Sequence, residues 1–278
     1  MTAGSAGEGL DPVRAYYATG AERTRLAEGY GPLERERTRE VLLRHLPPPP
    51  AVVADVGGGA GVHAIWLAGR GYEVHLRDLS AELLAFARRD AERAGVRLAS
   101  VAVCDARDLD LASERADAVL LLGPLYHLQA RAGRAEALAE ARRVLRHGGL
   151  AAVAAISRAA PVLDGLRLGL LEQEDHVRAL DEVARSGRFD PPAVSGFTRA
   201  YFHTPPQLRE EIADAGFEVV GVVGLEGIGW ALCDLAERWA DARRREAVLE
   251  AARRVEADAS VIGASPHLLG LARRPAER

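Results

Sequence analysis

Lysine is absent from this 278-residue chain, so arginine supplies every fixed positive side-chain charge. Acidic residues outnumber these arginines, and the formal net charge is −4. An acidic protein without a run of basic residues is a poor match for a phosphate backbone. We therefore expect a small-molecule substrate and no nucleic-acid partner.

Cysteines and long apolar runs are also scarce. Cys104 and Cys233 are the two cysteines, and they form no CxxC pair. They predict neither a disulfide framework nor a thiolate metal site. The sequence has no run of 18 apolar residues, so no membrane span is predicted. Met1–Leu10 lacks the basic and apolar regions of a signal peptide. These features predict a cytoplasmic protein without a membrane partner.

Hydrophobic residues make up 48% of the chain, enough for a sizeable core. Apolar runs predict strands at Ala51–Val56, Glu73–Arg77, Arg97–Val103, Asp117–Leu122, Leu150–Ile156, Phe217–Leu225 and His267–Ala272. Helical patterns cover Pro12–Ala27, Pro32–Leu46, Val62–Arg70, Ala81–Ala94, Ala130–Arg146, Pro205–Ala215 and Trp230–Ala257. Such alternation predicts an α/β fold, a parallel sheet with helices on both faces.

The alternation breaks after Ser157, and this break suggests how the chain is divided. The segment 158–200 is too long for a simple connection, so we interpret it as a helical lid. We expect a tail and helical cap at 1–46, the sheet core at 47–157, and completion of the core at 201–278.

A glycine-rich loop, Asp55-Val56-Gly57-Gly58-Gly59-Ala60-Gly61, follows the first predicted strand. Its glycines let the backbone turn sharply and approach a ligand. The dinucleotide fingerprint would need glycine where Val62 stands. The loop also begins with an acid, which would repel a pyrophosphate and attract a cationic ammonium group. The loop favours a positively charged ligand. The alternative is an ordinary glycine-rich turn between a strand and a helix, which would have the same kind of sequence.

Two further acids follow the next two predicted strands. Asp78 is placed to accept hydrogen bonds from ribose hydroxyls, or only to cap the next helix. Asp105 is placed to accept one from an adenine amino group, or is an ordinary loop residue. With Asp55, they put three acids at the ligand-binding edge of a parallel sheet. The series favours a nucleoside.

These residues resemble the ordered motifs of class I S-adenosylmethionine (SAM)-dependent methyltransferases. The resemblance extends to Leu120–Leu128 (LLLGPLYHL) and to Ala141–Leu150, where His147 replaces a frequent proline. It is close over about 50–157 and weaker over about 200–275. It implies a Rossmann-like, seven-stranded, mostly parallel sheet whose last strand runs antiparallel.

The resemblance also implies which residues hold each part of SAM. The expected contacts are Asp55, Gly57, Gly58 and Gly59 for the methionyl part, Asp78 and Leu79 for the ribose, Asp105 and Ala106 for adenine, and Leu122 and Gly123 beside the sulfonium.

The N-terminal segment resembles a cap found in the small-molecule branch of the family. It implies that Tyr16, Tyr17 and Arg25 contact SAM, with Arg25 as a partner for its carboxylate. A solvated charge on an amphipathic helix is the alternative for Arg25.

His127 is the first candidate for a catalytic base, because it follows the fourth strand on the loop that borders the methyl group. The alternative is that it forms a wall of the pocket. Tyr126 and His203 are the other catalytic candidates, while Trp230 and Phe197 are candidate walls for an aromatic acceptor.

No metal site is expected. The sequence has no HExxH pattern, and both cysteines are isolated. Catechol-type relatives carry an acid for Mg²⁺ where this chain has Gly123-Pro124. The NPPY signature of members that modify amides and nucleobases is also missing.

We therefore expect a metal-independent methyltransferase that uses SAM and acts on an oxygen, nitrogen or nucleophilic carbon of a small molecule in specialised metabolism. A non-catalytic SAM- or nucleoside-binding protein and an NAD-dependent oxidoreductase are the alternatives. A monomer and a homodimer both stay open, as does the identity of the acceptor.

Overall fold

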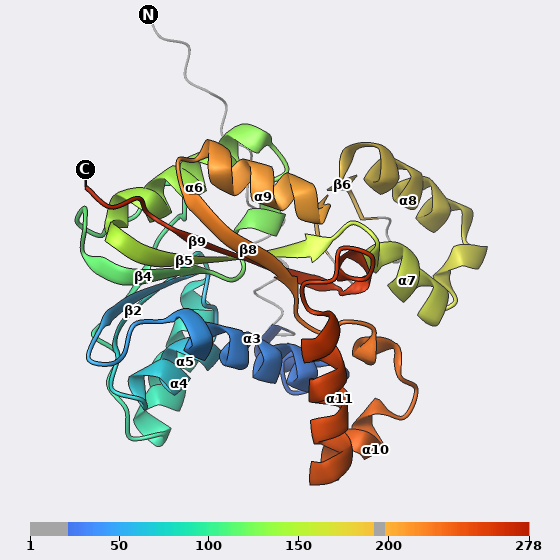
Figure 1. The fold of residues 1–278 in the computed structure, drawn as a ribbon, viewed down its shortest axis with the longest axis horizontal. Helices are drawn as coiled ribbons and strands as arrows, with labels where there is room; N and C mark the ends of the chain where they lie inside the picture. The colour runs from blue at the N-terminus through green and yellow to red at the C-terminus, as the bar shows by residue number, and fades with distance from the viewer. Residues whose placement is uncertain (1–21, 192–197, 278) are drawn as a thin grey trace, which may run out of the picture.

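The structure is a computed structural model that describes residues 22–191 and 198–277. Its centre is a nine-stranded sheet (Figure 1). The strands are β1 Val52–Val56, β2 Glu73–Asp78, β3 Ser100–Val103, β4 Ala116–Leu121, β5 Leu145–Ser157, β6 Arg188–Phe189, β7 Ala200–His203, β8 Glu218–Gly224 and β9 His267–Arg273.

The order of the strands places β1 near the middle of the sheet. Strands β3, β2, β1, β4 and β5 lie side by side and run parallel. On the other side of β5, β9 runs antiparallel to both β5 and β8. The predicted Rossmann-like fold is therefore confirmed, including its antiparallel last strand. The short strands β6 and β7, which extend the sheet beside the end of β5, were not predicted.

Helices cover both faces of the sheet (Figure 1). One face carries α3 Gly31–His45, α4 Val62–Ala68 and α5 Ala81–Arg93, and the other carries α6 Arg131–Val144 and α9 Pro205–Asp214. Neighbouring strand residues point to opposite faces. In β4, Leu120 therefore packs in the core beneath α3–α5, and Leu121 in the core beneath α6 and α9. A sheet buried on both sides explains its nearly continuous apolar strands.

Capping side chains fix the first residues of two of these helices, α5 and α9, at the positions that the sequence predicts. Ser80 accepts a hydrogen bond from the Leu83 amide at the start of α5. Thr204 caps α9 in a reciprocal box with Gln207. Both are short hydroxyl side chains that satisfy amides left open in the first turn.

The predicted long helix Trp230–Ala257 is wrong. The chain forms η3 Gly229–Ala231, then α10 Leu235–Ala240, and then α11 Ala242–Val255. Asp241 adopts an extended backbone, and its carboxylate accepts from the Arg244 amide at 2.8 Å, so it caps a new helix. The apolar spacing resumes after the break, which is why the pattern reads as one helix.

The chain between β5 and β7 forms α7 Ala160–Arg167, η2 Leu170–Glu172 and α8 Glu174–Ser186. These helices lie beyond one end of the sheet, on the right in Figure 1. Of the predicted helix Pro12–Ala27, the described part contains α2 Glu22–Arg25. Single 3₁₀ turns, η1 Leu125–His127 and η4 Ile262–Ala264, follow β4 and precede β9. In the described part of the chain, no helix is long and apolar enough to cross a membrane.

A buried ion pair joins α6 to α9. The Arg134 guanidinium donates to both carboxylate oxygens of Glu211, at 2.8 and 2.6 Å. It also donates to the carbonyls of Leu128 and Gln129, and it lies 3.6 Å from the Tyr201 ring centre. One side chain therefore holds two helices and the loop after β4 together.

Replacement of Glu211 by alanine should be strongly destabilising, because it leaves the buried Arg134 charge without its partner. We expect a loss of about 3–5 kcal/mol in the free energy of unfolding, measured by urea denaturation. The control is Glu210→Ala, whose partner Arg131 is exposed, and it should unfold near the wild-type midpoint. Equal midpoints for the two variants would contradict this role.

Candidate active site

A cavity opens at the carboxyl ends of the central strands. It gathers residues from β1, β2, the loops after β3 and β4, and the N-terminal helices. Of the predicted cofactor-binding residues, those lining it are Arg25, Asp55, Gly57, Gly58, Gly59, Asp78, Leu79, Asp105, Ala106, Leu122 and Gly123. Tyr16 and Tyr17 lie outside the described residues.

The glycine loop forms the floor of this cavity because larger residues would not fit. Gly57 has φ +72°, and a Cβ there would lie 2.5 Å from the Pro124 ring. A Cβ on Gly58 would lie 2.6 Å from an Asp55 carboxylate oxygen. The loop therefore packs directly against the β4 loop and the Asp55 side chain.

Asp55 is the least ordinary group in the site. It is 1% exposed and lines the cavity, and its carboxylate oxygens have no hydrogen-bond partner among the described residues. Burial, with added repulsion from Asp78, outweighs the opposing effect of the Ala64 backbone and raises the pKa of Asp55 to about 7. A buried carboxylate without a partner is costly, and a cationic or hydrogen-bond-donating ligand would relieve that cost.

The other two acids are already engaged with the chain. Asp78 accepts hydrogen bonds from the amides of Gly59 and Ser80, each at 2.8 Å, so it ties the glycine loop to the start of α5. The Asp105 carboxylate pairs with Arg107 at 2.7 Å. Both residues still line the cavity.

Arg25 does not have the solvated charge that was the alternative prediction. Its guanidinium pairs with Glu34 of α3 through two contacts, at 2.5 and 3.0 Å. The pair closes one side of the cavity, which both residues line.

His127 and Tyr126 also line the cavity, and each is 7% exposed. Their rings contact each other edge to face, with centroids 4.7 Å apart. Burial lowers the pKa of His127 to about 4, so its imidazole is neutral at physiological pH and is a weak base.

The structure does not bring His203 or Trp230 to this cavity. His203 is fully buried, with Nε2 3.3 Å from Glu211 and its ring against Tyr201. Trp230 lines a neighbouring hollow with Tyr30, and its indole donates to the Ala264 carbonyl at 3.1 Å. Phe197 lies outside the described residues.

Three further ionisable residues that line the cavity could not be predicted from the sequence: Glu34, His63 and His267. They come from α3, the first turn of α4 and the start of β9. His63 has its Nδ1 buried without a partner in the described chain, and burial lowers its pKa to about 4. No motif connects positions so far apart, and each fits an ordinary helix or strand pattern.

Glu34, Glu226 and His267 present oxygen and nitrogen atoms within 4.8 Å of one another, as metal ligands do. These atoms already have partners. Arg25 binds the Glu34 carboxylate, and the His267 ring nitrogen Nδ1 lies 2.5 Å from Glu226 Oε1. With His267 protonated, the cluster is therefore balanced in charge without an added cation.

Comparison with known proteins identifies a methyltransferase domain in the part of the chain that contains the glycine loop. Residues 53–149 match the family model described as a methyltransferase domain. No curated protein matches the chain significantly.

Many solved structures share the fold. A SAM-dependent methyltransferase from Methanosarcina mazei is 18% identical, with a TM-score of 0.59 over 85% of this chain and 98% of that chain. The [4+2]-cyclase SpnF is 19% identical, with a TM-score of 0.56 over 88% and 81%. Geranyl diphosphate methyltransferase, with geranyl diphosphate and sinefungin, is 19% identical, with a TM-score of 0.52 over 86% and 78%.

The matched segment contains the glycine loop and all three acids of the cavity, so residues 53–149 form a methyltransferase domain. Solved SAM-dependent methyltransferases share the fold of the chain, so SAM is the cofactor whose fit to this cavity is considered. The residues present fit SAM, since the buried Asp55, without a hydrogen-bond partner in the described part of the chain, lines a cavity that would hold a cationic ligand.

Asp55→Asn should stabilise the cofactor-free protein increasingly as pH rises. The folded-state pKa of Asp55 is about 7, above that of an unfolded aspartate, so wild-type stability falls as pH rises towards 7. Between pH 5 and 8 the advantage of the variant should grow by about 2–3 kcal/mol, measured by urea unfolding. Asp90→Asn on α5 is the control, and parallel pH profiles for the two variants would refute this account.

Asp78→Ala should weaken SAM binding. The carboxylate orders the Gly59 and Ser80 amides at the cavity, and losing charge-assisted hydrogen bonds costs about 1.5–3 kcal/mol. Calorimetry should therefore show a loss of about 10- to 150-fold in affinity. Asp90→Ala should bind SAM like the wild type; an unchanged affinity in Asp78→Ala would remove Asp78 from the site.

Proposed function

We propose that the enzyme transfers the methyl group to a small molecule that enters the cavity completely. The observation that carries this proposal is the burial of the groups beyond the glycine loop. Tyr126, His127 and His267 line the cavity and are only 7–8% exposed. A side chain on the surface of a macromolecule would not reach groups buried so deeply, whereas a small acceptor enclosed with the cofactor would.

SAM supplies an activated methyl group, and the protein supplies position and a dry environment. In this proposal Asp55 and the glycine loop fix the cofactor, with Asp78 holding the loop in place. The paired Arg25 and Glu34 close one side of the cavity. Tyr126 and His127 form the wall beside the β4 loop, and the low pKa of His127 favours that role over proton removal.

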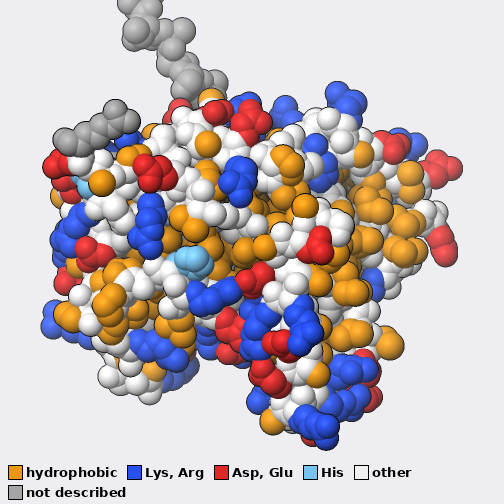
Figure 2. All heavy atoms as spheres, viewed as in Figure 1, with side chains coloured by type: hydrophobic (Ala, Val, Ile, Leu, Met, Phe, Trp, Pro, Cys, Tyr) orange, Lys and Arg blue, Asp and Glu red, His pale blue; other side chains and the backbone are white. Residues whose placement is uncertain are grey.

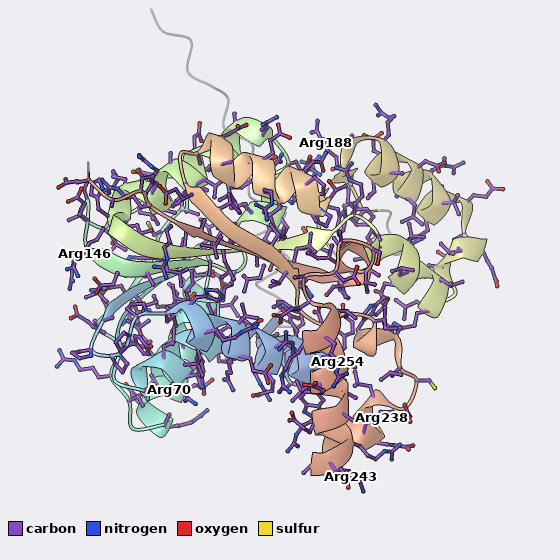
Figure 3. The ribbon with its side chains drawn as sticks, viewed as in Figure 1. Arg70, Arg146, Arg188, Arg238, Arg243 and Arg254 are labelled. Carbon is purple, nitrogen blue, oxygen red and sulfur yellow. The ribbon has the colours of Figure 1, made fainter. Side chains whose placement is uncertain are left out.

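The surface charges support a small-molecule acceptor over a nucleic acid. Basic and acidic side chains are intermixed on the face shown in Figure 2. Arg253 pairs with Glu40 and Arg44 with Glu256, each at 2.6 Å. Figure 3 shows labelled arginines spread over several parts of the chain, without a common stripe; Arg243 and Arg254 share α11, while the others are Arg70, Arg146, Arg188 and Arg238.

We further propose that no metal takes part, because the carboxylates of the one metal-like cluster in the described chain are engaged by Arg25 and His267. A role in specialised metabolism is part of the proposal and draws support from geranyl diphosphate methyltransferase, a neighbour with a small-molecule acceptor. The neighbour named as a cyclase makes a reaction other than methyl transfer the second candidate.

The test uses SAM labelled in its methyl group and a cell extract separated by ultrafiltration. We expect label to enter the low-molecular-weight fraction when wild-type enzyme is present. Chelator should not reduce the transfer. Label in protein or nucleic acid would overturn the small-molecule proposal. SAM binding without any transfer would favour the second candidate.

With that low-molecular-weight fraction as acceptor, His127→Asn should keep most of the wild-type kcat, because asparagine preserves a polar wall of similar reach. His127→Ala should raise KM more than it lowers kcat. A fall in kcat of about 10²–10⁴ in both variants would instead identify His127 as a base.

A further inference from the structure

His267 and Glu226 form a dyad at the edge of the cavity. Nδ1 of His267 lies 2.5 Å from Oε1 of Glu226. With Nδ1 held by the carboxylate, Nε2 is the ring nitrogen left for the cavity that His267 lines. A carboxylate that fixes one imidazole nitrogen sets the tautomer and orientation of the other, as in nucleophile–histidine–carboxylate sites.

Glu226 is positioned for this single task. It is fully buried and does not itself line the cavity in the described chain. Its other oxygen accepts from the Ser265 hydroxyl at 2.7 Å and from the His267 amide at 3.1 Å. These bonds fix the carboxylate before any ligand binds, and the fixed carboxylate orients the imidazole.

The strand order places this dyad away from the nucleoside end of the cavity. Asp78 and Asp105 follow β2 and β3, on one side of β1. His267 begins β9, which lies on the other side of β1, beyond β4 and β5. The glycine loop after β1 lies between them. An acceptor that meets the methyl group opposite the nucleoside would therefore lie at the His267 end.

We propose that His267, oriented by Glu226, removes the proton from the acceptor, so that the acceptor is a hydroxyl compound or an amine rather than a carbon nucleophile. This inference rests on the proposed methyl transfer to a small molecule. The acceptor oxygen or nitrogen forms the new bond to the methyl carbon. The carbon–sulfur bond breaks with its electron pair remaining on sulfur, and the acceptor proton passes to Nε2 of His267.

The charges around the ring support this assignment. Burial lowers the pKa of His267, but the carboxylates of Glu34 and Glu226 outweigh it and raise the pKa above its usual value, while Arg25 opposes them. Tyr30 packs on the ring at 6.4 Å, and its own pKa is raised by burial, so it stays neutral. His63, across Glu34, is neutral because burial lowers its pKa. His267 is thus a much stronger base than His127.

The first experiment needs no acceptor. Imidazole nitrogen NMR of the full chain, saturated with the demethylated cofactor product, would follow His267 against pH, with its signal assigned by its loss in His267→Asn. We expect titration above the usual 6.5 in the wild type and at lower pH in Glu226→Gln. A midpoint that does not move in Glu226→Gln would overturn the dyad.

The second experiment uses the low-molecular-weight fraction that accepts label. His267→Asn keeps an amide donor for Glu226 and removes Nε2. We expect kcat to fall by about 10²–10⁴, with SAM affinity within threefold of wild type by calorimetry. The acidic limb of the wild-type rate profile should disappear in this variant and move to lower pH in Glu226→Gln. His147→Asn, near the start of β5 at the opposite edge of the sheet, should match the wild type.

Each outcome points to one conclusion. Wild-type kcat and an intact acidic limb in His267→Asn would overturn the base assignment and leave the proposed function standing. Loss of SAM binding in His267→Asn would make the residue structural and would also overturn the assignment. Wild-type enzyme that binds SAM but labels no small molecule would remove the proposed function, and this inference with it, while the NMR titration stayed as described.

Discussion

The buried carboxylate of Asp55, which has no hydrogen-bond partner among the described residues, is the constraint on which the site depends. It closes the central strand and lies so near Gly58 that no side chain fits there. Repulsion from Asp78 adds to its burial. Burying this carboxylate costs free energy of folding, and a bound cationic ligand would offset that cost. The buried carboxylate of Asp55 therefore accounts for the glycines of the loop, for the polar end of β1 and for the positive charge expected of the cofactor.

The order and direction of the strands give the cavity two chemically different ends. Asp78 and Asp105 lie on one side of β1, where their backbone and arginine partners hold them in place. On the other side, β9 runs antiparallel to β5 and brings the start of its strand to the ligand edge. A parallel β9 would put His267 at the opposite edge. The reversal of the last strand is what adds a histidine to the site.

Much of the fold and of the cofactor end could be predicted because their signals are local. The glycine loop and the acids after strands follow directly from short segments, and caps such as Ser80 identify helix starts. The break between α10 and α11 at Asp241 could not be predicted, because the apolar spacing of the sequence continues across it. The Glu226–His267 dyad could not either, since its members are 41 residues apart and meet only through sheet pairing. Arg25 was placed at the cavity, but its partner Glu34 was not foreseen.

The balance of charge inside the cavity links its two ends. Arg25 neutralises Glu34 and His267 pairs with Glu226, whereas Asp55 has no such partner among the described residues. A cation is therefore favoured beside the glycine loop, and a neutral acceptor beside His267. When His267 takes up a proton, the new positive charge lies between two buried carboxylates that stabilise it. Without a cation nearby, Asp55, whose pKa is about 7, readily takes up a proton of its own. Asp55 therefore favours the charged cofactor before transfer, and Glu34 and Glu226 favour the protonated base after it.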